Sequence, residues 1–314
     1  MSFNILLTIK IILYFLLFLY LVPFFTFSLI YLIPLKYIQV VFYFITIILL
    51  MFLYPFVNKT VSIHGVKFQG NFGKSMFIKC LYVGKDYEPD LVKFLKKNLK
   101  SDDIFIDVGA NIGYFSIIAS TIIKNNPIYA IEPDPNNVNE MNNNIKINNI
   151  KNIKVLEIAA SNKNTTSDFY VCNVNSMWNQ VGKMNLWGKL SCLGYKKKKL
   201  KFRKLSKILD LDTNKRKVIK IDVEGHETEV INDLMHLIKN KKENNLWIVE
   251  TDKMNIIKLF KNNGYYVYHL PVSSIHVKGW EIPSLTLVNN LEEINKIQLF
   301  GVIFSNWIFS RKKL

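Results

Sequence analysis

A short apolar run that opens into a glycine-containing loop constrains this chain more than any other feature. The run Ile104–Ile106 ends at Asp107, the loop carries Gly109 and Gly113, and a second apolar segment begins at Tyr114. A buried strand, a tight glycine turn and a helix, in this order, form the unit with which a doubly wound sheet presents its backbone to a nucleotide-like ligand. The sequence therefore predicts an α/β fold with a ligand site at this turn.

The spacing of the loop departs from the dinucleotide fingerprint, whose glycines follow the pattern G-x-G-x-x-G. From Asp107 to Gly113 the loop reads D-x-G-x-N-x-G, so the last glycine comes one residue early and Asn111 replaces a glycine. This pattern resembles the loop with which class I methyltransferases bind S-adenosylmethionine. We expect the Asp107 carboxylate to bind the ammonium group of the methionine part. Asn111 is expected to cap the turn or to contact the cofactor carboxylate.

A second acidic residue ends the next predicted strand. Glu132 follows the run Ile128–Ile131 and lies 23 positions after Gly109, close to the roughly 20 expected for an acid that binds ribose hydroxyls. A carboxylate can accept both protons of a vicinal diol. The glycine loop and Glu132 together therefore predict a nucleoside cofactor.

A third polar cluster follows another apolar strand, in the segment Lys220–Glu227. We expect this strand to lie beside the first one in the sheet, with Glu250 closing the same edge. Methyl transfer to oxygen needs a base for the hydroxyl proton, and the candidates are Asp222, Glu224 and His226. A capping role for Asp222 is the alternative. A metal bound by oxygen ligands at this edge is conceivable, but the spacing does not require one.

Strands and helices alternate along most of the chain, which predicts a doubly wound, mostly parallel, seven-stranded Rossmann-like sheet. Upstream of it, Thr60–Phe68 and Met76–Val83 are predicted as strands and Tyr87–Lys100 as an amphipathic helix. Segment 173–214 interrupts the alternation, either as a surface insertion or as a functional lid. We expect three parts: a membrane anchor at 1–57, a leading segment at 58–100 and a methyltransferase domain at 101–314. The expected strands of the domain are Asp103–Val108, Ile128–Ile131, Lys154–Ala159, Thr166–Val171, Val218–Val223, Leu246–Glu250 and Tyr265–Leu270.

The first 57 residues are almost free of charge. They contain Lys10 and Lys36 and no acid, so +15 of the formal net charge of +17 lies on the rest of the chain. The apolar runs Ile11–Ile33 and Tyr37–Val57 each reach the roughly 20 residues that cross a bilayer. We predict a transmembrane helical hairpin with both ends cytoplasmic, because lysines flank it. A cleaved signal peptide or a buried core helix is the alternative.

Composition also argues against some classes of protein. The cysteines Cys80, Cys172 and Cys192 are odd in number and form no C-x-x-C pair, which argues against a disulfide framework and a structural zinc site. The basic run Lys196–Lys204 lacks the aromatic interleaving of a nucleic-acid stacking platform. The positive charge fits either anionic lipid headgroups or a plain bias toward lysine.

Over about residues 86–270 the chain resembles the FkbM-type methyltransferase family. The blocks Asp102–Ser120 and Val218–Ile231 carry most of the resemblance, with Asp86–Leu99, Ile131–Asn148 and the run ending at Ser161 in support. The resemblance implies an S-adenosylmethionine-dependent O-methyltransferase that acts on hydroxyls of sugars, glycolipids or polyketides. The chain departs from the family at Ser101-Asp102, where a Pro-Gly turn is common, and near Leu205, where the usual Thr-Leu-Asp is missing.

The resemblance also assigns roles by position. It places Ala160 and Ser161 near the adenine and Asp222 and Glu224 at the reaction edge. It also places Glu88 in a block before the glycine loop, and we count Glu88 among the expected cofactor contacts. The positions that it matches to cofactor-contacting motifs are Asp107, Gly109, Asn111, Gly113, Glu132 and Asp134.

We therefore expect a membrane-anchored, cytoplasm-facing methyltransferase that uses S-adenosyl-L-methionine and no metal. The expected acceptor is a hydroxyl of a glycan or lipid-linked saccharide; membrane lipid is the expected contact of the hairpin, and nucleic acid is not an expected partner. Two alternatives stay open: an NAD- or nucleotide-sugar-dependent oxidoreductase on the same fold, and a non-catalytic membrane scaffold with a vestigial cofactor site.

Overall fold

The computed structural model describes residues 58–71, 75–84, 86–172, 180–181, 195–211, 213–271, 285–289 and 305–314. The predicted membrane hairpin at 1–57 and parts of the predicted insertion at 173–214 lie outside these ranges. Within them, no helix has both the length and the apolar character needed to span a bilayer.

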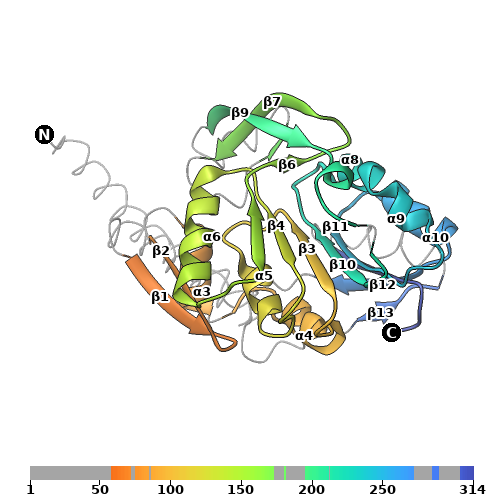
Figure 1. Cartoon of the computed structure of the whole chain (residues 1–314), viewed down its shortest axis with the longest axis horizontal. Coiled ribbons are helices and arrows are strands. Elements are labelled where there is room, and N and C mark those ends of the chain that lie inside the picture. Colours follow the sequence, from red (N-terminus) through yellow and green to blue (C-terminus); the bar gives the residue numbers. More distant parts are fainter. Residues whose placement is uncertain are drawn as a thin grey trace, which may run out of the picture.

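A mixed sheet of eight strands forms the centre of the described structure (Figure 1). In the order in which they lie side by side, its strands are β13 (Thr286–Leu287), β12 (Tyr266–Pro271), β14 (Ser305–Ser310), β11 (Leu246–Glu250), β10 (Lys217–Ile221), β3 (Ile104–Val108), β4 (Ile128–Ile131) and β5 (Ile153–Leu156). The five strands from β11 to β5 are parallel, whereas β14 runs antiparallel to both of its neighbours. The prediction of a mostly parallel sheet is confirmed. The predicted set of seven strands was wrong, because β13 and β14 were not foreseen and the predicted strand Thr166–Val171 belongs to a second sheet.

The chain order reverses between β3 and β10. From β3 the chain proceeds outward through β4 and β5, and it then returns to build β10 and β11 on the other side of β3. Such a switch point opens a crevice at the carboxyl ends of the strands, where ligands of doubly wound sheets bind. The predicted doubly wound topology is therefore confirmed, and it places the site at this edge.

Helices cover both faces of the sheet. One face packs against α3 (Met76–Gly84), α4 (Pro89–Asn98) and α5 (Tyr114–Ser120), and α6 (Pro135–Ile147) lies by the outer strand β5. The other face packs against α8 (Glu227–Asp233), α9 (Met235–Lys239) and α10 (Met254–Asn262). Residues 227–239 thus form two short helices and not one continuous helix.

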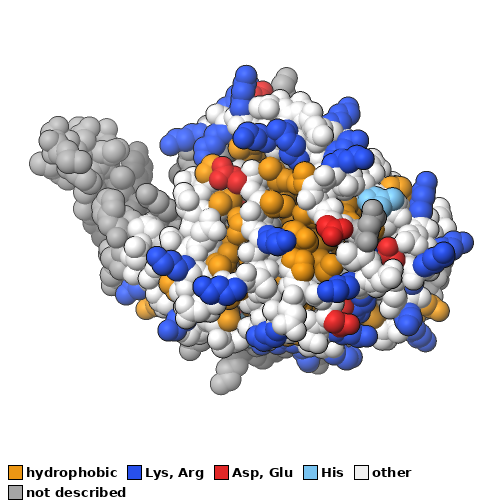
Figure 2. All heavy atoms as spheres, in the orientation of Figure 1, with side chains coloured by type: hydrophobic (Ala, Val, Ile, Leu, Met, Phe, Trp, Pro, Cys, Tyr) orange, Lys and Arg blue, Asp and Glu red, His pale blue; other side chains and the backbone are white. Residues whose placement is uncertain are grey.

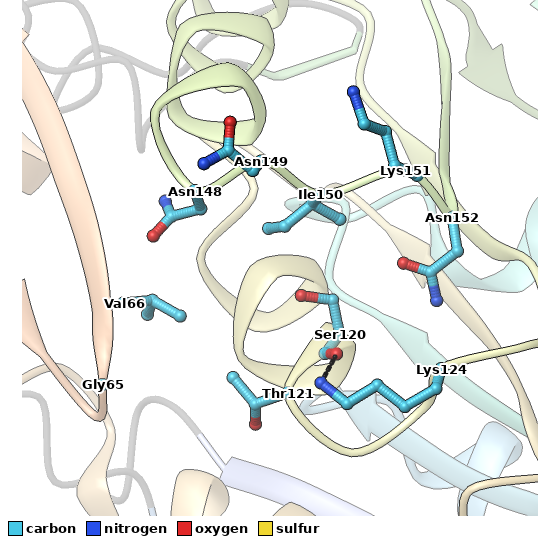
Figure 3. Close-up of a pocket in the computed structure, with 10 residues that line it drawn as sticks. All are labelled: Gly65, Val66, Ser120, Thr121, Lys124, Asn148, Asn149, Ile150, Lys151 and Asn152. Carbon is cyan, nitrogen blue, oxygen red and sulfur yellow. Dashed lines mark hydrogen bonds between the residues drawn. The ribbon is translucent and has the colours of Figure 1, made fainter.

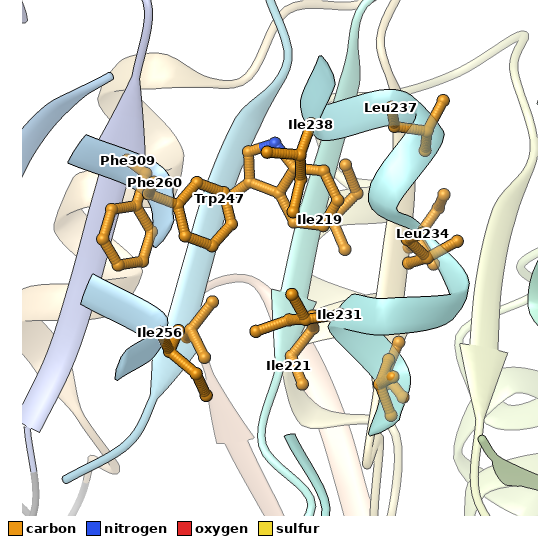
Figure 4. Packing of buried hydrophobic residues seen from close by; sticks show 14 of the residues in the cluster. Ile219, Ile221, Ile231, Leu234, Leu237, Ile238, Trp247, Ile256, Phe260 and Phe309 are labelled. Carbon is orange, nitrogen blue, oxygen red and sulfur yellow. The ribbon is translucent and has the colours of Figure 1, made fainter. Parts of the chain in front are cut away.

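The second face contains a densely packed aromatic core (Figure 4). The rings of Phe260 and Phe309 stack with centroids 4.0 Å apart, and Trp247 meets Phe260 edge-on at 5.3 Å. Phe260 comes from α10, whereas Trp247 and Phe309 come from neighbouring strands β11 and β14. This contact therefore fixes β14 in the sheet, although β14 follows β11 only much later in the chain.

A second sheet lies beyond the carboxyl edge of the first (Figure 1). Its strands, in spatial order, are β6 (Ala159–Ala160), β9 (Tyr195–Arg203), β7 (Thr165–Cys172) and β8 (Gln180–Val181). The lysine run of the sequence therefore forms part of a strand, β9, which pairs antiparallel with the whole of β7. Figure 2 shows lysine and arginine side chains gathered over this part of the molecule and hydrophobic side chains over the middle of the same face.

Two upstream predictions were wrong. The segment Thr60–Phe68 is not one strand but the hairpin of β1 (Asn58–Ile63) and β2 (Val66–Asn71), because His64 and Gly65 adopt φ values of 53° and 81° that turn the chain. The predicted strand Met76–Val83 is helix α3. Its buried residues Phe77, Ile78 and Leu81 share one helical face, and packing against β1 and β2 favours that arrangement over alternation.

Candidate functional site

The carboxyl ends of four adjacent parallel strands bring the predicted acidic residues to one edge. Asp107 lies within β3, Glu132 directly follows β4, Asp222 directly follows β10 and Glu250 ends β11. Strand β10 pairs with β3, as expected from the sequence, and Lys220 lies opposite Asp107 in this pairing. The edge therefore gathers residues that lie far apart along the chain.

The glycine loop packs tightly against the end of β10. Gly109 has φ 84°, and a Cβ at this position would overlap the backbone carbonyl oxygen of Asp222. The backbone N–H groups of Gly109 and Ala110 both donate to the carbonyl oxygen of Ile131, at 2.9 and 3.0 Å. Gly113 has φ 83°, and a Cβ there would lie 2.7 Å from Cγ of Met141. Both glycines are required by the fold of the loop.

We predict that Gly109→Ala lowers the free energy of unfolding by about 3 kcal/mol, because it combines backbone strain with an overlap against Asp222. Gly65→Ala is the matched control: Gly65 has φ 81° but open space around it, so only the backbone strain of about 1 kcal/mol applies. Urea unfolding of both variants measures the difference. Equal losses would show that the contact between the loop and β10 is not tight.

Asp107 presents a buried oxygen that has no partner among the described residues. The residue is 1 % exposed, and its Oδ2 accepts a hydrogen bond of 2.7 Å from Oγ of Ser116. Its Oδ1 is buried and unpartnered. Burial raises the pKa of the Asp107 carboxyl, and the ammonium of Lys220 partly opposes this. A buried acceptor without a donor is unfavourable, so this oxygen fits the ammonium group of a ligand.

Glu132 joins the glycine loop to the start of α6. Its Oε2 accepts from the backbone N–H of Asn111 at 2.9 Å, and its Oε1 accepts from the N–H of Asp134 at 2.9 Å and from Nδ2 of Asn137 at 3.1 Å. Burial raises the pKa of Glu132 to about 7. Since a carboxylate oxygen can accept more than one hydrogen bond, Glu132 can hold the loop and still accept from a ribose hydroxyl.

Asn111 and Asp134 occupy different parts of this corner. Asn111 adopts φ 50°, and its side-chain Oδ1 is buried without a partner in the described part of the chain. Asp134 is the N-cap of α6, where it accepts from the N–H of Asn136 at 3.1 Å, and it forms an ion pair of 3.3 Å with Lys198 of β9. Asp134 thus ties the second sheet to the site edge.

The structure brings the predicted adenine region into contact with one candidate base. Nε2 of His226 lies 3.1 Å from Oγ of Ser161, whose backbone N–H donates to the carbonyl of Arg203 at 2.9 Å. Ala160 lies in β6 and is buried. Burial lowers the pKa of His226, and the nearby Glu229 partly opposes this. His226 is therefore part of the contact between β10 and the second sheet.

Lys220 is the main residue that the sequence reasoning missed. It is 2 % exposed, its Nζ lies 2.9 Å from Oδ2 of Asp222, and it sits 4.9 Å from the ring centre of Phe115. Asp222, Asp107 and Glu88 raise the pKa of Lys220 against the opposing effect of burial. A lysine within the apolar strand KVIKI was the signal that could have revealed it, because a buried charge needs a partner.

Glu88 and Glu224 are two further acids of the site, and Glu88 is buried whereas Glu224 is exposed. Partial desolvation and the nearby Asp222 carboxylate raise the pKa of Glu224. Burial raises the pKa of Glu88 to about 7, while Lys220 opposes it. Oε2 of Glu88 accepts a hydrogen bond of 2.8 Å from Nδ2 of Asn306 in β14, so Glu88 lies toward β14. In the described ranges, no three His, Cys, Asp or Glu side chains are arranged to hold a metal ion.

A pocket lies away from this edge, near the far ends of the strands (Figure 3). It has a volume of about 310 Å³ and is bordered by the turn at Gly65, by the C-terminal end of α5 and by segment 148–152, which precedes β5. Its polar side chains bind the protein itself: Lys124 donates to the Ser120 carbonyl, and Asn152 donates to the Ile123 carbonyl. It contains none of the predicted site residues.

A family model supplies the family of the chain. The model of the Vibrio cholerae RfbT protein matches residues 72–298, which is more than half of the chain. The chain belongs to the family of the Vibrio cholerae RfbT protein. The match covers the glycine loop, the strand of Asp222 and the end of β11. It does not name the FkbM-type group, so that finer assignment stays a prediction. No match was found among the curated proteins.

Several solved structures of methyltransferases are similar to this chain. A precorrin-6y C5,15-methyltransferase from Geobacter metallireducens is 15 % identical, with 72 % of this chain and 87 % of that chain covered and a TM-score of 0.40. The methyltransferase FkbM from Methylobacillus flagellatus is 13 % identical, with 74 % of this chain and 54 % of that chain covered and a TM-score of 0.42. M. jannaschii TYW2, solved in complex with AdoMet, is 13 % identical (82 % and 88 % covered, TM-score 0.42). Likenesses of this strength carry no weight for function, which must come from the site.

Proposed function

We propose that the chain is an S-adenosylmethionine-dependent O-methyltransferase, of the FkbM type, that acts on a hydroxyl of a glycan or lipid-linked saccharide. The observation that carries this proposal is the unpartnered, buried Oδ1 of Asp107 beside the glycine loop, with Glu132 ending the neighbouring strand. One carboxylate can accept the ammonium group of the methionine part, and the other, on the adjacent strand, can accept the hydroxyl groups of the ribose.

The residues of the edge divide into a cofactor half and a reaction half. Asp107 would bind the ammonium group, Glu132 would bind the ribose, and Ala160 and Ser161 would border the adenine. Gly109 and Gly113 allow the loop its tight turn beside the ligand, because a Cβ at either position would overlap Asp222 or Met141. When bound, S-adenosylmethionine supplies a methyl group on a positively charged sulfur.

Asp222 is the best placed of the three candidate bases. Its backbone carbonyl contacts Gly109, so it borders the cofactor loop directly. Its side chain is 22 % exposed, which leaves it open to an acceptor, and Lys220 holds one of its carboxylate oxygens. The other oxygen can take the proton of the acceptor hydroxyl. His226 already contacts Ser161, and Glu224 is the remaining candidate.

Calorimetric titration distinguishes this proposal from the oxidoreductase alternative. We expect the full-length protein in detergent to bind S-adenosylhomocysteine and not NAD, because the loop lacks the second glycine with which dinucleotide sites accommodate a pyrophosphate. Binding of NAD without binding of S-adenosylhomocysteine would contradict the proposal. The scaffold alternative instead expects that Asp107→Ala leaves the glycan profile of the cell unchanged.

We also propose that the apolar runs at 11–57 anchor the protein in a membrane, with the site on the cytoplasmic side. The support for this comes from the sequence: the two runs are each long enough to span a bilayer, and lysines flank them. Cell fractionation tests it: the protein is expected in the membrane fraction, and release from that fraction by salt alone would contradict it.

A further inference from the structure

The carboxyl edge has a second polar region on the side of β10 away from the glycine loop. Strands β11 and β14 lie on that side, whereas β3 lies on the other. Glu250 ends β11, and Asn306 lies opposite it in β14. Glu88 reaches the same region from the residue before α4, where its carboxylate accepts a hydrogen bond from Asn306. The three side chains therefore form a group that is separate from Asp107 and Glu132.

The side chain of Asn306 offers this region a hydrogen-bond acceptor for a ligand. The residue is 1 % exposed, and its Nδ2 points at Oε2 of Glu88 at 2.8 Å. Its Oδ1 is buried and has no partner in the described parts of the chain. A buried amide oxygen without a donor is unfavourable. This feature does not depend on the nearby acids, and it indicates a ligand that carries a hydrogen-bond donor.

The backbone at Glu88 supports the same interpretation. Glu88 has φ 42° in the left-handed region, which is unfavourable for a residue with a side chain. It occupies the N-cap position of α4, yet its side chain makes no capping hydrogen bond. Asn111 and Glu224 are strained in the same way at the same edge. Strain of this kind collects at functional sites, and at Glu88 it turns the carboxyl group toward β14 instead of toward the helix.

The charges of the region suit a neutral ligand. Glu88, Asp222 and Glu250 lie around the ammonium of Lys220, which is the one cation that lowers the pKa of Glu88 and Glu250 among the described residues. Burial raises the pKa of Glu88 to about 7 and that of Glu250 well above its ordinary value. A carboxyl group that keeps its proton near neutral pH can donate as well as accept. The region therefore offers both donors and acceptors, which is what hydroxyl groups need.

We propose that Glu88, Glu250 and Asn306 bind the acceptor of the methyl group through its hydroxyl groups, next to the hydroxyl that Asp222 deprotonates. The inference rests on the proposed function. It moves Glu88, which we count among the expected cofactor contacts, to the acceptor side of the site. Asp222 and Lys220 then stand between a cofactor region on β3 and β4 and an acceptor region on β11 and β14.

The experiment uses Glu250→Leu and Asn306→Leu in the full-length protein, with Asp107→Asn as the control on the cofactor side. Calorimetry measures the Kd for S-adenosylhomocysteine. A second assay measures the rate of transfer of labelled methyl to a lipid extract from cells that lack the protein. The quantity compared is the amount of extract that gives the half-maximal rate. We expect that amount to rise about tenfold or more, since a lost hydrogen bond of 1.4 kcal/mol gives a factor of ten, while the Kd stays within about twofold.

The outcomes separate this inference from the proposed function. If both variants lose affinity for S-adenosylhomocysteine as Asp107→Asn does, and need no more extract, the inference is overturned while the proposed function stands. If the unchanged protein binds no S-adenosylhomocysteine, both fail. Thermal unfolding shows whether Asn306→Leu folds. Glu250 is only partly buried at the end of β11, so Glu250→Leu decides the question if Asn306→Leu does not fold.

Discussion

Asp222→Asn is expected to lower kcat about a hundredfold or more and to leave the Kd for S-adenosylhomocysteine within about threefold. The reason is its position: Asp222 contacts the cofactor loop through its backbone and presents a partly exposed carboxylate at the reaction edge. Asparagine keeps the size of the side chain but cannot take up a proton. Single-turnover kinetics with labelled S-adenosylmethionine and calorimetry give the two numbers.

Glu224→Gln and His226→Gln are the comparisons for this variant, because both residues lie in the same segment. His226 is engaged with Ser161, so its substitution is expected to lower kcat less than Asp222→Asn does. Equal losses of turnover and affinity in Asp222→Asn would make Asp222 a binding residue. A larger loss of turnover in Glu224→Gln would assign the base to Glu224.

Asp107→Asn is expected to weaken binding of S-adenosylhomocysteine about tenfold to a hundredfold. The unpartnered Oδ1 of Asp107 is the acceptor for the ammonium group, and a hydrogen bond to a charged group contributes about 1.5–3 kcal/mol. Ser116→Ala is the matched control, because it removes only the donor to Oδ2 and keeps the carboxylate. An equal loss in Ser116→Ala would show that the orientation of Asp107 matters and its charge does not.

The pH dependence of binding gives a second test of Asp107. Burial raises the pKa of this carboxyl in the free protein, whereas an ammonium ligand favours its ionised form. Binding should therefore release a proton from the protein, and affinity should increase as the pH rises through the range in which Asp107 ionises. In Asp107→Asn this dependence should disappear. Affinity that falls with rising pH over that range would contradict the assignment.

Local signals in the sequence were enough to predict which acidic residues meet at the carboxyl edge of the sheet. The strand before Asp107, the spacing to Glu132 and the strand before Asp222 are each read from one short segment. The rule that parallel strands end at one edge then places them together. The register of Lys220 against Asp107 agrees with that reasoning.

The positions of β14, β9 and α3 could not be predicted from local signals, because they depend on contacts between distant segments. The hydrogen bond from Asn306 to Glu88 joins residues 218 positions apart, and no local pattern near Asn306 indicates that β14 enters the sheet between β11 and β12. The lysine run became strand β9 only because β7 provides its hydrogen-bonding partner. The short apolar run of α3 fits both the period of a helix and the alternation of a strand, and packing against the β1–β2 hairpin favours the helix.

Transfer of labelled methyl from S-adenosylmethionine to a membrane lipid and glycan extract, taken from cells that lack the protein, tests the central claim most directly. We predict label in a glycan or glycolipid fraction with the unchanged protein and a loss of about a hundredfold or more in rate with Asp222→Asn. Absence of label from every fraction, or the same rate with Asp222→Asn, would contradict the claim that the carboxyl edge of this sheet is a methyl-transfer site.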